Sequence, residues 1–422
     1  MSKIVEKLKL TFGDKTLRKR ILFVLGILVI TRLLAVIPIP GVDALRLQSL
    51  FAGSEFLNLL NLFSGGGLSN LSLVMLGVGP YITASIIMQL LTVMVPRLKA
   101  MYQEEGEAGR RRFSQYSRML AVPLAIVQAF AFIKLLQGQG VLPPLPFNIF
   151  ATDIVIVVAG SMLLMWLGEL ITEFGIGNGV SLIIFAGIVS ALPASASQLI
   201  FTFDPAQLPI YIVGLAVALL VIFGVVVITE AERPIPITYS KQARGAAFGG
   251  VSTYLPLRVN QSGVIPIIFA LSILLFPQMI FQFLAQSTVP MIASISTFML
   301  NLLANAWIYA SAYFVLVVAF TYFYTAVTFD PDAISTNLQK SGAFVPGVRP
   351  VTATADYLSR VLVRLTLVGA LFLGIIAVLP LVLRALTGIQ ALAIGGTALL
   401  IVVSVVIDLI KKIDAQVSAR EY

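Results

Sequence analysis

Long apolar stretches alternate along this chain with short polar segments rich in Lys and Arg. A helix of about 20 apolar residues is long enough to cross a hydrocarbon core of about 30 Å. We therefore predict an all-α polytopic membrane protein with ten transmembrane helices, near residues 21–37, 73–95, 119–137, 152–171, 180–200, 208–229, 262–284, 304–327, 365–382 and 392–410. The composition agrees, because 11% of the residues are charged, whereas soluble domains carry about 25%.

One of these apolar stretches is interrupted. Residues 57–96 break at Gly65–Gly67 and then restart as a full-length span, which contains the polar side chains of Thr83, Ser85 and Gln89. Lipid cannot hydrogen-bond an irregular backbone, so broken chain at membrane depth must be buried in protein or line a water-filled cavity. The segment is therefore either a glycine turn on the outer surface or a half-helix folded back into a pore.

The net charge of +9 is distributed unevenly. Of the 28 Lys and Arg residues, 24 fall in the N-terminus, the segments 96–118, 230–261 and 328–364, and the C-terminus; the others are Arg32, Arg46, Lys134 and Arg384. Cytoplasmic loops carry the excess of basic residues, so both termini are expected in the cytoplasm. No small-residue cleavage site follows residues 21–37, so we expect the first helix to be retained.

Several chemistries are disfavoured by the residues that are missing. The chain has no Cys and no His, so thiolate chemistry and the commonest general base and metal ligand are absent. It also lacks the G-x-x-x-x-G-K-[ST] phosphate-binding motif. We expect neither an enzyme nor a site for a metal or cofactor.

Eight motifs give the chain a family resemblance. They are FSGGGLS with GVGPYITASIIMQLLT (63–92), PIPG (38–41), EEGEAGRRRFSQYSR (104–118), WLGELITEFGIGNGVSLIIFAGIV (166–189), STYLPLRVN (252–260), SGVIPIIF (262–269), KSGAFVPGVRP (340–350) and GGTALLIVVSVVID (395–408). Taken in chain order, they resemble the SecY/Sec61-alpha family, which includes the channel subunit of the bacterial Sec protein translocase. The resemblance covers nearly the whole chain.

The resemblance implies a fold and a function. Two inverted five-helix halves, 1–200 and 201–422, would form a clamshell with a central pore, a plug half-helix at about 61–72 and a lateral gate. The chain would be the central subunit of the channel that translocates unfolded polypeptides across, and inserts membrane proteins into, the bacterial cytoplasmic (inner) membrane. It would be a passive pore, driven by the SecA ATPase or by the translating ribosome.

The resemblance also assigns residues to the pore. Ile82 and Ile86 share a helix face because they are four residues apart, and Ile184 and Ile188 repeat this spacing. An apolar ring blocks ions by dewetting and offers no polar group to grip a passing chain. The family's constriction ring falls on Ile82, Ile86, Ile188, Ile268 and Ile401, and the plug includes Phe63, Ser64, Gly65, Gly66, Gly67 and Leu68.

Gate and docking residues follow in the same way. The lateral gate would lie between spans two and three on one side and seven and eight on the other, with Gln89, Gln128 and Asn260 as polar residues in or near them. Two long cytoplasmic loops, 230–261 and 328–357, would dock SecA or the ribosome, including its RNA, through Lys241, Arg244, Phe344 and Arg349. Further implied partners are SecE, SecG, signal sequences, nascent or preprotein chains and membrane lipid.

Three alternatives remain open at this point. A proton- or sodium-coupled solute transporter needs ionisable residues near mid-membrane, but Asp153 and Glu169 fall near predicted span ends, and Arg32 is within snorkelling reach of the outer interface. An insertase or an accessory member of the same family, dedicated to special cargo, is the second. A membrane enzyme is the third, disfavoured by the missing His and Cys.

Overall fold

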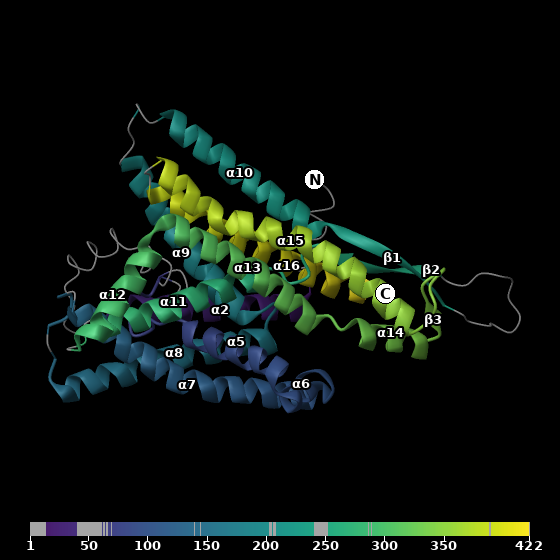
Figure 1. The fold of residues 1–422 in the computed structure, drawn as a ribbon, viewed down its shortest axis with the longest axis horizontal. Coiled ribbons are helices and arrows are strands. Elements are labelled where there is room, and N and C mark those ends of the chain that lie inside the picture. Colours follow the sequence, from purple (N-terminus) through teal and green to yellow (C-terminus); the bar gives the residue numbers. More distant parts are fainter. Residues whose placement is uncertain are drawn as a thin grey trace, which may run out of the picture. The chain divides into compact units, whose positions relative to one another are not determined.

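The computed structural model describes residues 14–39, 61, 64, 66–68, 70–138, 140–143, 145–201, 205, 208–239, 252–285, 287, 289–387 and 390–421. Helices dominate (Figure 1). They are α2 (Lys15–Val36), α5 (Gly79–Met94), α6 (Pro96–Gln103), α7 (Gly106–Gly138), α8 (Phe147–Phe174), α9 (Gly179–Phe201), α10 (Leu208–Glu230), α11 (Ile265–Leu284), α12 (Pro290–Ala304), α13 (Ala306–Thr328), α14 (Pro331–Lys340), α15 (Thr352–Thr387) and α16 (Gln390–Glu421).

The membrane class predicted from the apolar pattern is confirmed. Within the described residues, six helices are long and apolar enough to cross a membrane, or seven if the bent pair α5 and α6 forms one span. The count of ten spans stays a prediction. Three of the described helices lie outside the ten predicted spans: α6 falls in the basic segment 96–118, α12 between the seventh and eighth spans, and α14 between the eighth and ninth.

The second predicted span begins later than the apolar pattern indicated. Helix α5 starts at Gly79 rather than near residue 73, because Gly77 has φ +58° and Pro80 occupies the first turn. Proline has no N–H to donate within a helix, so it is favoured at a helix start. At the other end, α5 and α6 meet at an angle of 112°, where Pro96 opens α6.

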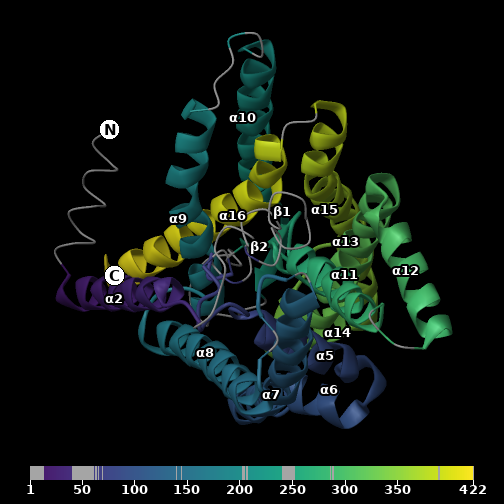
Figure 2. The ribbon, with the colours of Figure 1, turned by 90° about the vertical axis from the view of Figure 1, so that its left-hand side faces the viewer.

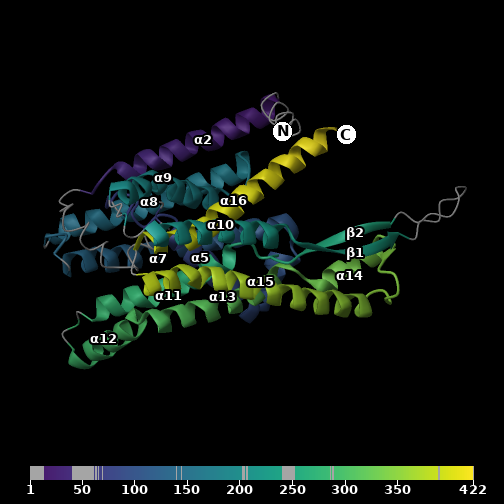
Figure 3. The same cartoon turned by 90° about the horizontal axis from the view of Figure 1, so that it is seen from above.

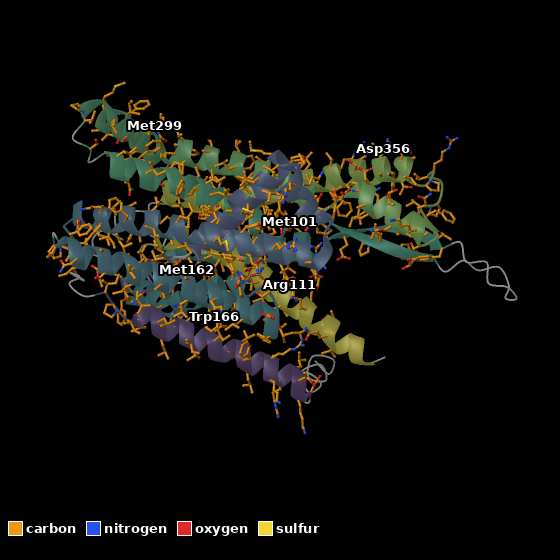
Figure 4. The ribbon with its side chains drawn as sticks, turned by 90° about the horizontal axis from the view of Figure 1, so that it is seen from below. Met101, Arg111, Met162, Trp166, Met299 and Asp356 are labelled. Atoms are coloured by element: carbon orange, nitrogen blue, oxygen red, sulfur yellow. The ribbon has the colours of Figure 1, made fainter. Side chains whose placement is uncertain are left out.

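A small apolar cluster fixes this bend. Met101 of α6, labelled in Figure 4, is buried with Met88 of α5 and Phe113 of α7. The Tyr102 and Phe113 rings also lie 4.9 Å apart. Helices α5 and α6 both pack on α7, as Figure 2 shows. The basic segment 96–118 is therefore a packed helical turn and not an irregular loop.

The chain divides into two compact units. Unit 1 comprises residues 1–208, 271–308 and 401–422, and unit 2 comprises 209–270 and 309–400. In unit 1, α2 packs on α8 and α9, while α8 packs on α7 and α9. Helices α11, α13 and α16 each pass from one unit into the other. The predicted halves, 1–200 and 201–422, and their inverted relation remain predictions.

Unit 2 contains a small sheet, where the sequence predicted only loops. Strand β1 (Glu232–Tyr239) pairs antiparallel with β2 (Ser252–Arg258) and, at its end, with β3 (Ala343–Phe344). The strand signal was hidden by Pro234 and Pro236, because proline cannot donate to a ladder. Pro234 faces Pro256, and such a pair fits where opposite residues exchange no hydrogen bonds.

The sheet and α14 share one apolar core with the N-terminal part of α15. Its buried members are Ile235, Leu257, Phe329, Val345, Leu358, Val361 and Leu362. Helix α14 begins at a defined cap, because Asp330 accepts hydrogen bonds of 3.0 and 3.1 Å from the N–H groups of Asp332 and Ala333. The described parts of segments 230–261 and 328–357 are therefore folded, and they hold their connecting turns in place.

Candidate functional site

The predicted plug segment folds against the end of α2. The N–H of Ile39 donates to the carbonyl oxygen of Leu71 (2.9 Å), and the N–H of Leu73 donates to Ile37 (3.1 Å). Pro38 and Ser72 form an isolated antiparallel bridge between these contacts. The segment that follows the glycine break is therefore tied by its backbone to the residues that follow the C-terminal end of α2.

The plug segment is internally capped by two serines. The Ser64 hydroxyl accepts a hydrogen bond of 3.0 Å from the N–H of Leu68, and the Ser72 hydroxyl donates one of 2.9 Å to the carbonyl oxygen of Gly67. Leu68 is buried, as predicted for an apolar plug contact. The described residues from 64 to 78 form turns and one bridge, whereas Asn61 is helical, and the plug half-helix stays a prediction. Phe63 and Gly65 lie outside the described residues.

Helix α8 holds the far end of this segment. The Ser161 hydroxyl donates a hydrogen bond of 2.7 Å to the carbonyl oxygen of Gly77. At the preceding residue, a Cβ atom placed on Gly160 would lie 2.1 Å from the carbonyl oxygen of Leu73. Only glycine permits this approach of backbone to helix. The segment 61–78 is thus fixed by α2 at one side and by α8 at the other.

The five predicted ring residues are all buried. Ile82 and Ile86 lie on the buried face of α5, Ile188 lies in α9 beside the buried Ile184, and Ile401 lies in α16. Ile268 of α11 belongs to unit 2 and the other four to unit 1. Burial is required of side chains that seal a closed channel, but ordinary core residues share it. Their convergence on one constriction stays a prediction.

The predicted gate residues differ in how their polar atoms are satisfied. The side-chain oxygen of Gln89 is buried in α5 and has no hydrogen-bond partner among the described residues. Gln128 is buried in α7. The side-chain oxygen of Asn260 accepts a hydrogen bond of 3.3 Å from the Ser262 hydroxyl. Gln89 stands out, because leaving a buried acceptor unpaired costs about 1–3 kcal/mol.

The predicted docking turn is held rigidly beneath an exposed tip. Arg349 and Phe344 are exposed, and Phe344 pairs with Thr238 as part of β3. The Thr354 hydroxyl donates to the carbonyl oxygen of Arg349 (2.8 Å), and the Ser335 hydroxyl donates to that of Val351 (2.5 Å). Lys241 and Arg244 lie outside the described residues.

Val351 gives this turn an unusual backbone. Its φ of +70° places a β-branched residue in the left-handed region, where such residues are outliers. Strained backbone of this kind persists only when the surroundings over-determine it, and it clusters at functional sites. Here the hydrogen bond from Ser335 supplies that restraint. The sequence offered no signal for it, because the contact joins residues 16 positions apart.

Arg118 and Arg32 have partners on other helices that the sequence did not reveal. Arg118 of α7 and Glu169 of α8 form an ion pair of 2.6 Å. The guanidinium of Arg32 bonds to the carbonyl oxygen of Ala186 and to the Ser190 hydroxyl in α9, and its reach to the outer interface stays a prediction. The described residues hold no group of three or more His, Cys, Asp or Glu side chains able to bind a metal.

Known proteins resemble this chain along nearly its whole length. A family model described as SecY matches residues 72–410. The protein translocase subunits SecY of Mycobacterium bovis and Mycobacterium leprae are 41% and 42% identical to this chain, each over 96% of both chains. The family resemblance inferred from the motifs is thereby confirmed.

Solved structures agree in fold. A structure described as a protein-conducting channel has a TM-score of 0.66 and 20% identity, covering 93% of this chain and 91% of its own. Another, with a TM-score of 0.62 and 20% identity, covers 96% and 93%; its plug domain is described as stabilising the closed state of the translocation channel and maintaining a membrane seal. Sec61 in a canine ribosome–channel complex gives 0.61 at 20% identity, covering 93% and 91%.

Proposed function

Because the chain belongs to the SecY family, we propose that it acts as a passive conduit, opened by its cargo and driven by partners. It is a multi-pass membrane protein and the channel-forming subunit of a protein translocase, and it is not an enzyme. The finer proposal is that unfolded polypeptides cross the bacterial cytoplasmic membrane through it and that membrane proteins leave it sideways into lipid. Both termini would face the cytoplasm, where the basic segments lie.

The observation that carries the proposal is the packing of segment 61–78. A short irregular segment is held at the outer end of α2 and on α8 by a few backbone and serine hydrogen bonds. Its apolar side chains, among them Leu68, Leu71 and Met75, are buried, so they stabilise the seated position. Because the segment is not part of a helix, it can leave that position while the helices stay folded. A seal that must open for a passing chain requires this property.

The proposed pore residues act without specific binding. Ile82, Ile86, Ile188, Ile268 and Ile401 would form an apolar constriction that excludes ions by dewetting. Branched side chains without donors or fixed charge let unrelated sequences slide past. The segment from Ser64 to Leu68, with Phe63 and Gly65, would close the constriction from outside. Gln89, Gln128 and Asn260 would line the lateral gate, through which a signal sequence leaves toward lipid.

The partners proposed for this chain fall into two groups. SecA and the ribosome, including its RNA, would supply the driving force by docking on Phe344 and Arg349 and on Lys241 and Arg244. The fold of ribosome-bound Sec61 supports a ribosome interaction, and basic tips suit electrostatic contact with phosphate. SecE and SecG would complete the channel, and preproteins, signal sequences and lipid would contact its interior and gate.

Reconstitution tests the proposal directly. The chain, with SecE and SecG from the same bacterium, is placed in proteoliposomes, and protease protection of a preprotein is measured with SecA and ATP. We expect protected preprotein only when the chain, SecA and ATP are all present. Solute uptake without preprotein transport would instead identify a solute transporter. Transport of one preprotein from a varied set would identify an accessory member of the family.

A further inference from the structure

Arg32 places a charge in an otherwise apolar helix. It is the one charged residue between Ile21 and Ile37, and a cation inside a membrane span is retained only where it has partners. Within unit 1, its Nη2 atom donates a hydrogen bond of 2.8 Å to the carbonyl oxygen of Ala186 in α9 and also contacts the Ser190 hydroxyl. Figure 3 shows α2 lying beside α9.

The other side of the same guanidinium lies at the plug segment. A Cβ atom placed on Gly66 would be 3.5 Å from Nη1 of Arg32, so bare backbone faces the cation. Gly66 has φ +84°, a conformation that glycine adopts without strain. A hydrogen bond of 2.8 Å from its N–H to the carbonyl oxygen of Asn61 closes the turn. The glycine break therefore ends directly against Arg32.

The contact on α9 falls in the stretch that carries a predicted ring residue. Ala186 and Ser190 lie on either side of Ile188, whose side chain is buried. One cation thus binds the helix that bears Ile188 and lies close to the turn that bears Gly66. A planar guanidinium with five donors can bridge two partners in this way, whereas a lysine ammonium acts as a point charge.

We propose that Arg32 is a latch, a positioning residue that holds the plug turn against α9 and so keeps the channel closed at rest. The inference rests on the proposed function, because it takes 61–72 as the plug. Displacing the plug removes the contact at Gly66, and moving α9 outward removes the contact at Ala186. Either movement weakens the other half of the latch, so plug release and movement of the Ile188 segment are coupled.

Resting ion conductance in planar bilayers is the first measurement. Arg32→Gln keeps a polar side chain but lacks the positive charge and the planar set of five donors. Arg32→Lys keeps the charge and lacks that planar set. We expect Arg32→Gln to raise resting conductance by about tenfold, which corresponds to removing about 1.4 kcal/mol of stabilisation from the closed state. The resting conductance of Arg32→Lys should lie between that of the unmodified chain and that of Arg32→Gln. Ser190→Ala should raise resting conductance less than Arg32→Gln does.

Lys134→Gln is the matched control. Lys134 is also a cation of unit 1 outside the basic segments, but its ammonium lies over the Phe150 ring, 4.7 Å from the centroid. Its removal changes net charge equally and leaves the plug contacts in place, so the seal should remain as tight as in the unmodified chain. Leakage as large as that of Arg32→Gln would show that charge loss alone opens the channel, and the latch would be rejected.

A reversible tether between the plug and α2 tests whether Arg32 acts as a latch or only supports helix packing. The Asn70 side chain donates to the carbonyl oxygen of Ala35 (3.4 Å), so cysteines at Ala35 and Asn70 can join the plug to α2 through a short bis-methanethiosulfonate crosslinker. The chain has no natural Cys. In the Arg32→Gln background, crosslinking should restore the seal and reduction should release it. A leak unchanged by complete crosslinking would mean that Arg32 only supports the packing of α2 on α9.

Deleting residues 62–70 from the otherwise unmodified chain shows which proposal has failed. If the deletion leaks while folded Arg32→Gln stays tight, the plug exists and the latch is wrong. If the deletion also stays tight and no preprotein is transported in proteoliposomes, the proposed function itself is wrong. Leakage in both, with rescue by the tether, supports the latch.

Discussion

The hydroxyl of Thr354 in the first turn of α15 donates a hydrogen bond of 2.8 Å to the backbone carbonyl oxygen of Arg349. The exposed arginine proposed to dock the motor or the ribosome is therefore mounted on a long helix that continues toward the membrane. A force or movement applied at this tip is passed to α15 through a short, hydrogen-bonded turn and not through a slack loop.

Reversing the charge of Arg349 should impair docking. Arg349→Glu replaces attraction with like-charge repulsion at an interface, which costs several kcal/mol in unfavourable cases. We expect SecA-stimulated translocation in proteoliposomes to fall by about tenfold or more, which corresponds to about 1.4 kcal/mol for each factor of ten. Arg360→Glu is the control, because Arg360 is also exposed and lies on α15. Full stimulation in Arg349→Glu would remove this residue from the docking surface.

Loosening the docking turn should have a smaller effect. Thr354→Val and Ser335→Ala each delete one hydrogen bond to the turn, worth about 0.5–1.5 kcal/mol. We expect weaker SecA or ribosome binding with unchanged resting conductance, measured by cosedimentation and in planar bilayers. Val351→Gly in the Ser335→Ala background should relieve the strained φ of +70° and recover thermal stability. Binding that is insensitive to all three changes would show that turn rigidity plays no part in docking.

The five isoleucines should seal the channel together. Replacing Ile82, Ile86, Ile188, Ile268 and Ile401 by Ser, singly and jointly, makes the constriction wettable, so ions should pass at rest. The plug can mask single changes, and the joint variant should therefore conduct more when residues 62–70 are also deleted. Conductance and proton leak are the readouts. A folded joint variant without the plug that remains as tight as the unmodified chain would place the constriction elsewhere.

Removing the unpaired acceptor of Gln89 should stabilise the resting fold. Gln89→Leu eliminates a buried oxygen that lacks a partner among the described residues, a defect that costs about 1–3 kcal/mol. We expect a higher unfolding temperature in detergent and, if Gln89 lines the gate, slower insertion of a signal sequence. Gln128→Leu serves as the comparison on α7. A lower unfolding temperature for Gln89→Leu would mean that the oxygen is satisfied in the membrane.

The close approach of α8 to the plug segment should tolerate no side chain. A Cβ atom in Gly160→Ala would lie 2.1 Å from the carbonyl oxygen of Leu73, so backbone must move, at a cost of about 1–3 kcal/mol. We expect a lower unfolding temperature in detergent and a raised resting leak. Gly26→Ala in α2 is the counterpart, since nothing lies within 4 Å of its Cβ. Gly26→Ala should stabilise α2 by about 0.5–1 kcal/mol. Equal changes in unfolding temperature and leak for Gly26→Ala and Gly160→Ala would contradict the close packing of α8 on the plug segment.

The sequence by itself determined the class, the family and the function. Apolar length identifies spanning helices because lipid leaves the backbone no other partner, and contiguous motifs such as KSGAFVPGVRP name the family because each is read along one segment. Glycines also marked the break at residues 65–67, since φ restrictions are local, whereas the start of α5 at Gly79 was not predicted from the sequence. These properties depend on neighbours in the chain, so one sequence suffices to read them.

Only the tertiary structure decided how distant segments hold one another. The hairpin of β1 and β2 was missed because its prolines argue locally against a strand, whereas a core that includes Leu358 and Val361 stabilises it. The contacts of Arg32 with Ala186, Ser161 with Gly77 and Ser335 with Val351 join elements that the chain keeps apart. Such pairs form only when helices pack, because packing fixes the helix rotation that decides which side chains meet.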